Sequence, residues 1–456
     1  MTFCEECFKK QCKIDELEDT IVRLKAKIRR QDRTAKEGFF GSSTPSSKKP
    51  LRSNTSDEGK PRSGGGRPGH KGHGRSSVSE DDADRVERIA VDQTCPDCGS
   101  VLESKDTKER TVMDCEPVKM QKILYRLEQK RCPKCKKIIR ARAPGVLPRG
   151  LYGNQLLAHV ATQHYIYGNS LGQIEKQTGV GYSSLVDALH QLARHMKDVP
   201  AALIKAYRLA PVKHADETGW RTDGQNGYAW LFCSKDISIF IIRNTRSAKV
   251  PHDVFGPEQL FGVLVVDRYN GYNKLLILIQ YCYAHLLRGV QDIEKEFPQN
   301  AEIKSFVEAL APQLANAMSL RTMDISDKQF KQQAAKIKGK IIQITNRPAR
   351  HPAIQKIQNI FRDKADRLYH WADDRAVPAD NNFAERELRP LVIARKVSFG
   401  SQSQEGARTR ETLMSVLHTL KKRTPDVAGA LKSALDKLAE NPDLDLSKTL
   451  FNLDSS

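Results

Sequence analysis

Three acidic residues stand where distant parts of the chain could bring their carboxylates together. Asp216 lies in the segment VKHADETGW, and Asp267 follows Val263 to Val266, an apolar run typical of a buried strand. If the two strands are neighbours at the centre of a sheet, the two carboxylates come together. Paired carboxylates repel each other, so a cluster of them indicates divalent cations, and oxygen ligands favour two Mg²⁺ or Mn²⁺ ions.

The third carboxylate is expected on a later helix, VPADNNFAERELRPLVIARK, after the N-cap-like stretch Asp380-Asn381-Asn382. Glu385 is the predicted member, and Glu387 is the alternative. Two positions along a helix differ by about 200° of rotation, so only one of the glutamates can face the strands. The other is expected to pair with an arginine.

Four cysteines have the spacing of a structural zinc site: Cys95 and Cys98 in TCPDCGS, and Cys132 and Cys135 in RCPKCKK. Each CxxC pair directs two thiolates at one ion, and two pairs complete the tetrahedral shell that one Zn²⁺ prefers. Strand-like residues between the pairs, Lys122 to Tyr125, favour a zinc ribbon. A closed shell leaves no position for substrate, so this zinc is expected to be structural.

The elements that must position the acids follow from the hydrophobic pattern. Residues 211–243 are predicted to form three strands, AKVPHDVFG a short helix and residues 263–266 a fourth strand, the order of a ribonuclease H-like fold. A helical pattern then runs for roughly a hundred residues before Glu385. We therefore predict a catalytic domain over 206–400 with a helical insertion over about 286–375.

The other segments make this a multidomain α/β chain, in which a zinc ribbon and an N-terminal coiled-coil-like helix precede the core. Residues 1–37 carry apolar residues at heptad spacing, which fit a short coiled coil or a helix packed on its own protein: Ile14, Leu17, Ile21, Leu24 and Ile28. Residues 38–80 form a flexible basic linker, and 81–145 the ribbon. Residues 146–205 form a helix-turn-helix or a plain helical hairpin, with Ser184 to Met196 as the recognition helix. Residues 401–456 form a C-terminal helical region and tail.

Composition narrows the class of partner. The chain has 75 Lys and Arg against 55 Asp and Glu, a net charge of +20, which favours a polyanion such as DNA. No apolar run of about 18 residues and no apolar signal core occur, so a cytosolic protein without membrane contact is expected. Ten cysteines are too few for a disulfide scaffold. Cys4, Cys7 and Cys12 lack an obvious fourth ligand and are expected to be free thiols.

The motifs HADETGW, VVDRYNGY, YCYAHLLRG and NNFAERELRPL together resemble transposases of the insertion sequence sixty-six family, and GGGRPGHKGHGR and the two CxxC motifs extend the resemblance over nearly the entire chain. The resemblance implies a DDE-type catalytic triad at Asp216, Asp267 and Glu385. Two positions depart from the family pattern: Arg268 replaces a glycine, and Tyr283 replaces a tryptophan.

The same resemblance implies supporting residues. Cys282 and His285 are similar to a CxxH signature of DDE transposases, so His285 and Arg288 are expected near the scissile phosphate; a packed histidine is the alternative. Cations beside Glu385 are expected to bind DNA phosphates, although some could balance nearby glutamates. These cations are Arg386, Arg389, Arg395 and Lys396.

The expected function is that of a DNA transposase, which binds the terminal repeats of its insertion sequence and catalyses metal-dependent strand cleavage and strand transfer. Its substrate is double-stranded DNA, in the element ends and the target. Pairing two ends implies a homodimer or a larger synaptic assembly, and the resemblance implies accessory element-encoded proteins and a nucleoid-associated location in the prokaryotic cytosol. Two alternatives stay open: a non-catalytic DNA-binding protein derived from a transposase, and a metal-dependent nuclease that does not join ends.

Overall fold

The computed structural model describes residues 120–131, 133, 138–140, 143–148 and 150–454, together with Leu17, Glu18, Thr20, Ile21, Asp81 and Val101. The four predicted zinc ligands, Cys4, Cys7 and Cys12, and the predicted linker all lie outside these residues. Of the heptad positions, Leu17 and Ile21 are described. Both are helical, and their side chains are 52% and 48% exposed.

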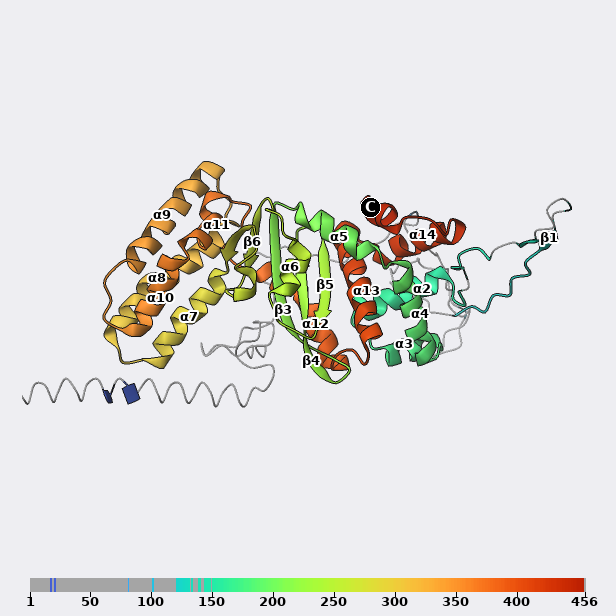
Figure 1. The fold of residues 1–456 in the computed structure, drawn as a ribbon, viewed down its shortest axis with the longest axis horizontal. Coiled ribbons are helices and arrows are strands. Elements are labelled where there is room, and N and C mark those ends of the chain that lie inside the picture. The colour runs from blue at the N-terminus through green and yellow to red at the C-terminus, as the bar shows by residue number, and fades with distance from the viewer. Residues whose placement is uncertain are drawn as a thin grey trace, which may run out of the picture. The chain divides into compact units, whose positions relative to one another are not determined.

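A five-stranded sheet forms the centre of the fold (Figure 1), in the order β5-β4-β3-β6-β7. Within this sheet β3, β4 and β5 are antiparallel neighbours, whereas β6 pairs in parallel with β3 and β7 pairs in parallel with β6. The predicted meander, short helix and buried fourth strand are confirmed. Their bounds are β3 (Val212–Thr222), β4 (Gln225–Cys233), β5 (Ser238–Arg243), α6 (Lys249–Phe255), β6 (Val263–Val266) and β7 (Leu278–Tyr281).

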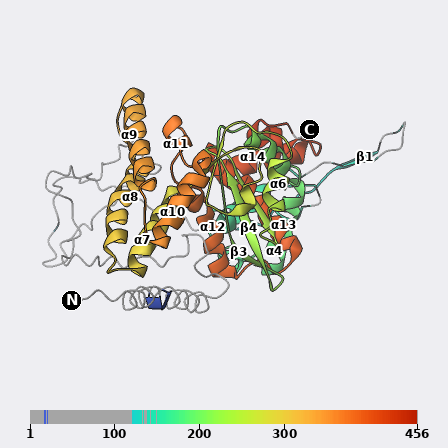
Figure 2. The same ribbon diagram turned by 60° about the vertical axis from the view of Figure 1, so that its left-hand side comes forward.

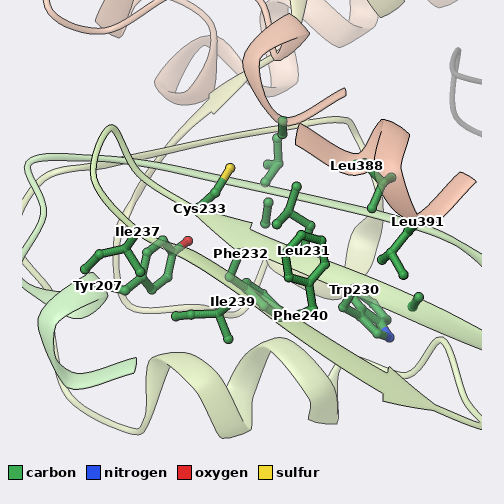
Figure 3. Close-up of a cluster of buried hydrophobic side chains, with 14 of the residues drawn as sticks. Tyr207, Trp230, Leu231, Phe232, Cys233, Ile237, Ile239, Phe240, Leu388 and Leu391 are labelled. Carbon is green, nitrogen blue, oxygen red and sulfur yellow. The ribbon is translucent and has the colours of Figure 1, made fainter. Parts of the chain in front are cut away.

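Cross-strand pairing decides which side chains share a face of this sheet. Asp216 pairs with Leu231 and Glu217 pairs with Trp230, so the two acids point to opposite faces. The face of Asp216 is covered by α12 (Asn382–Ser398), which packs on β3 and β4 through apolar residues such as Leu388 (Figure 3). Asp216 and the helix that carries Glu385 therefore meet on one side of the sheet.

The opposite face packs aromatic rings against α6 and α5 (Val199–Arg208). The Phe232 ring of β4 lies 6.1 Å from Phe255 of α6 and 6.3 Å from Tyr207 of α5, both edge to face. Trp230 and Phe232 are stacked, with an angle of 4° between their planes. Such buried rings fix the strands that carry the acids.

The outer edge of the sheet, at β5, is covered by α13 (Gln404–Arg423). Alternate backbone N–H groups of β5 donate to side chains four residues apart on α13: Ser238 to Thr419 at 3.1 Å, Phe240 to Ser415 at 2.9 Å, and Ile242 to Glu411. Four helical residues advance about 6 Å and two strand residues about 6.6 Å, so the two spacings match. The helix supplies the acceptors that a sixth strand would otherwise supply.

Helices from both ends of the described chain share one hydrophobic core with the sheet. The segments predicted as helix-turn-helix are α3 (Leu171–Thr178) and α4 (Tyr182–His195), and the predicted recognition helix thus begins two residues earlier than expected. Its apolar residues, including Leu185 and Leu192, are buried toward α13, α2 and α3. The other members are α2 (Asn154–Tyr165), α14 (Val427–Glu440) and α15 (Leu446–Phe451).

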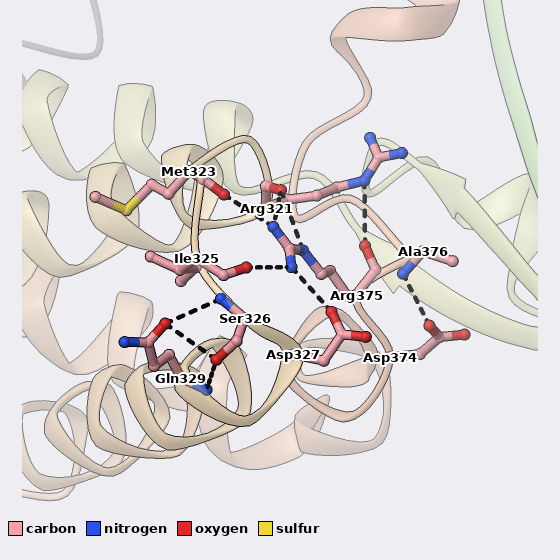
Figure 4. Close-up of polar contacts among 9 residues, drawn as sticks. All are labelled: Arg321, Met323, Ile325, Ser326, Asp327, Gln329, Asp374, Arg375 and Ala376. Carbon is pink, nitrogen blue, oxygen red and sulfur yellow. Dashed lines mark hydrogen bonds and ion pairs between the residues drawn. The ribbon is translucent and has the colours of Figure 1, made fainter.

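Between β7 and α12 the chain forms a group of helices (Figure 2), in the region where the sequence predicts a helical insertion. They are α7 (Tyr283–Glu296), α8 (Ala301–Leu320), α9 (Asp327–Thr345), α10 (Pro352–Asp363) and α11 (His370–Asp373). Arg375, in the segment between α11 and α12, hydrogen-bonds the loop between α8 and α9 (Figure 4). Its guanidinium donates to the carbonyls of Met323 and Ile325 at 2.8 Å and to Asp327 at 2.9 Å.

One strand prediction is wrong. Lys122 to Tyr125 form no strand, and the antiparallel pair of this region is β1 (Gln129–Arg131) with β2 (Ile138–Arg140), on either side of the second CxxC motif. Alternating apolar and polar residues do not by themselves make a strand, because a strand also needs hydrogen bonds to a neighbouring strand. Among the described helices, none combines the length and apolar character that crossing a bilayer requires.

Candidate active site

Asp216 and Asp267 stand side by side in the sheet. The parallel ladder pairs Val212 with Val263 and His214 with Val265, a constant offset of 51 residues. Continued by two residues, the same offset places Asp216 opposite Asp267, directly after the last residue of β6. The predicted juxtaposition of the two aspartates thus follows from the strand register.

Glu385 reaches the same place from the first turn of α12. Its side chain is 14% exposed, and its Oε1 lies 3.5 Å from Arg288 Nη2. Its charge is one of those that raise the pKa of Asp216. Glu387 points elsewhere, as helix rotation predicts, but its partner is not an arginine: Oε2 lies 3.0 Å from Ser238 Oγ and 3.2 Å from Lys422 Nζ.

Only one of the two carboxyl oxygens of Asp216 accepts a hydrogen bond from the described residues. Its Oδ1 accepts the Glu217 backbone N–H at 2.9 Å, whereas its buried Oδ2 has no hydrogen-bond partner among the described residues. Burial, followed by the charges of Glu217, Asp267 and Glu385, raises the pKa of Asp216 well above its usual range. A bound cation would reduce the repulsion between these carboxylates and would give the buried Oδ2 a partner. The carboxylate oxygens are therefore suitable ligands for a hard divalent ion.

The described part of the chain holds no group of three His, Cys, Asp or Glu side chains arranged closely enough to enclose an ion. One reason is visible at Glu385, which is turned toward Arg288. The structure therefore brings the three predicted acids into one region without closing them into a ligand shell.

Glu217 is a buried acid that the sequence analysis missed. Its Oε1 accepts from Arg246 Nε at 2.8 Å, and its Oε2 accepts from the Tyr272 hydroxyl at 2.9 Å. Burial and the charge of Asp267 raise the pKa of Glu217 to about 7, against the lowering effect of Arg246. The guanidinium also lies 4.3 Å from the ring centre of Tyr269. Because both oxygens are occupied, Glu217 supports the site from the opposite face of the sheet.

The proposed supporting residues lie on α7. Arg288 contacts Glu385, as given above, and His285, one turn earlier, is partly buried. Cys282 is fully buried, and burial raises the pKa of its thiol to about 12. Its sulfur accepts the Asn381 backbone N–H at 3.1 Å, so this cysteine is a structural contact. Tyr283 is buried and donates to the Leu368 carbonyl at 2.6 Å.

The four cations expected to bind DNA divide into two kinds. Arg386, Arg389 and Lys396 are exposed on α12. Arg395 is only 6% exposed, and its Nη1 donates to Thr218 Oγ1 and to the Gly219 carbonyl, both at 2.7 Å. Arg395 thus holds β3 from the buried side of α12, unlike the three exposed cations, and its binding of phosphate stays a prediction.

Known proteins are similar to this chain. An uncharacterized protein of Sinorhizobium fredii, y4qI, is 22% identical over 409 residues, which cover 78% of this chain and 73% of the relative. A second one, y4jD, is 23% identical over 193 residues, 39% of this chain and 38% of its own. The Transposase IS66 family matches residues 149–409, from just before α2 into α13. Because that match covers more than half of the chain and includes all three acids, the chain belongs to the Transposase IS66 family.

Proposed function

We propose that this chain is a DDE-type DNA transposase with a ribonuclease H-like core, which cleaves the ends of its element and transfers them to target DNA. The observation that carries the proposal is the register of Asp216 with Asp267, faced by Glu385 from α12. The strand order and the parallel pairing of β3 with β6 and of β6 with β7 support the fold assignment. Family membership supports DNA as the substrate.

In this mechanism Asp216, Asp267 and Glu385 would hold two Mg²⁺ or Mn²⁺ ions. Such ions, when bound, supply Lewis-acid activation of water or a 3′-OH and stabilise charge on the phosphate. Asp216 contributes the buried Oδ2 that has no partner within the described residues. Arg288, 28% exposed beside Glu385, is placed to donate to a phosphate oxygen once Glu385 has turned away.

The exposed side of α12 offers a path for the DNA backbone. Arg386, Arg389, Ile393 and Lys396 are spaced by three or four residues and are all exposed, so they form one stripe that begins beside Glu385. Its cations contact phosphates without reading sequence. The predicted zinc ribbon and helix-turn-helix are proposed to bind the terminal repeats, in a dimer or larger assembly with accessory proteins.

The α12 stripe is tested with two arginines of the same helix. Arg389→Ala should weaken DNA binding equally for all sequences and lower the slope of affinity against salt by about one ion, because one phosphate contact is lost. Arg395→Met should leave that slope unchanged and lower the free energy of unfolding by about 2 kcal/mol, because two buried acceptors lose their donor. Filter binding at several salt concentrations and urea unfolding separate the two effects.

The activity is tested with labelled DNA that carries the flanking ends of the gene, in Mg²⁺ or in EDTA. Asp216→Asn, Asp267→Asn and Glu385→Gln should still bind DNA and form neither free 3′ ends nor joined products. Glu387→Gln is the matched control, because this glutamate lies on the same helix but contacts Lys422, and it should retain activity. Cleavage without joining would favour a nuclease, and end binding without either product a non-catalytic DNA-binding protein.

A further inference from the structure

Asn381, the residue before α12, uses all of its polar groups in contacts with other elements. Its side-chain Nδ2 donates to the Ala215 carbonyl at 2.9 Å, and its Oδ1 lies 2.9 Å from His214 Nδ1. Its backbone N–H donates to Cys282 Sγ at 3.1 Å, and its carbonyl accepts the Glu385 N–H at 3.2 Å. The residue is 1% exposed.

Three of these four partners are an acid itself or lie next to or level with one, and His214 lies two residues before Asp216 on β3. Ala215 precedes Asp216 on β3. The β6–β7 ladder pairs Val266 with Tyr281, and the same offset places Cys282 opposite Asp267. The fourth partner is Glu385 itself. A single amide side chain and its peptide group thus touch the backbone neighbourhood of all three carboxylates.

Capping of the helix does not explain this arrangement. Asparagine at an N-cap position usually accepts a hydrogen bond from the first turn of its own helix. The Asn381 side chain makes no such bond and instead contacts β3. An asparagine is required there, because the Ala215 carbonyl needs a donor and the His214 ring, donating through Nδ1–H, needs an acceptor. Neither aspartate nor leucine supplies both.

We propose that Asn381 is a positioning residue, which sets the depth and rotation of α12 so that Glu385 can reach the metal ions held by Asp216 and Asp267. The proposal rests on the proposed function. Asn381→Asp keeps the size and the acceptor but places a carboxylate against the Ala215 carbonyl. A displaced start of α12 is expected to move Glu385, whose N–H donates to Asn381, while the cations farther along the helix stay exposed.

The test uses the full-length protein and measures Mn²⁺ affinity from the rise in melting temperature with Mn²⁺ concentration, together with DNA affinity and cleavage rate. For Asn381→Asp we expect the half-saturating Mn²⁺ concentration to rise at least tenfold and the cleavage rate to fall about 100-fold, with DNA affinity within twofold of wild type. Asn382→Asp, one residue along, is the matched control and should behave as wild type.

Asn381→Ala, which adds no charge, is measured in parallel and should show the same loss of Mn²⁺ affinity. Folded variants with wild-type Mn²⁺ affinity would overturn the proposal, and so would loss of folding in both, since Asn381 would then serve the fold alone. If wild type binds Mn²⁺ through Asp216 but cleaves no DNA, the proposed function fails, whereas the Mn²⁺ comparison still decides the role of Asn381.

Discussion

Replacing Asp216 by asparagine is expected to stabilise the metal-free protein. The asparagine Oδ1 can still accept the Glu217 N–H, whereas the acid that faces Asp267 and Glu385 is removed. A site that holds several carboxylates for an ion is costly to fold without that ion. The same substitution removes a proposed metal ligand, so stability and activity should change in opposite directions.

The size of the effect follows from proton linkage. Because burial and neighbouring acids raise the pKa of Asp216, the folded protein keeps a proton that the unfolded chain releases above a pKa of about 3.9. The stability that Asp216 contributes is therefore fully present below the unfolded pKa and falls as pH rises above it. The loss should approach about 1.4 kcal/mol for each pH unit over which the folded protein keeps the proton that the unfolded chain has released.

Urea unfolding in EDTA at pH 5, 6 and 7 measures this loss as the difference between wild type and Asp216→Asn. Glu217, with a pKa of about 7, titrates in both proteins and so contributes to both profiles. Asp324→Asn, in the exposed loop after α8, is the control and should run parallel to wild type. Parallel profiles for wild type and Asp216→Asn would refute the reasoning about this site.

Five further substitutions test other contacts by urea unfolding. Arg246→Met should cost about 3 kcal/mol, because it leaves the Glu217 carboxylate buried without its cation, and Glu217→Gln in the same chain should restore part of the loss. Tyr272→Phe should cost about 1 to 2 kcal/mol by removing a donor to Glu217; an unchanged midpoint would contradict that bond. Gly262→Ala should cost at least about 1 kcal/mol, since its φ is +87° and a Cβ would lie 2.2 Å from a backbone oxygen, whereas Gly289→Ala, in open space on α7, should be neutral or stabilising.

The sequence predicts the acid pair well because two local signals agree. Four consecutive apolar residues end at Asp267, and the strand that carries Asp216 belongs to a meander with clear turns. Helix periodicity also separates Glu385 from Glu387. These features depend on residues close together in the chain, so pattern alone fixes them.

Contacts between distant segments could not be predicted in this way. Arg395 is one of several cations on α12 in the sequence, and its burial depends on where Thr218 and Gly219 of β3 lie. Glu217 acquires Arg246 as a partner from a loop 29 residues later, which carries no motif. Such pairings follow from how α12 and the loops pack on the sheet, and hydrophobic pattern does not encode them.

The row of bonds between β5 and α13 has a consequence for how the protein associates. An edge strand with open N–H groups can recruit an extended segment of another chain, in ordered assembly or in aggregation. Here Ser238, Phe240 and Ile242 already donate to α13, so this edge accepts no added strand. During synthesis the β5 edge stays uncovered until α13, which begins at Gln404, has been made. A chain truncated before that residue would leave the N–H groups of β5 open to pairing with other chains.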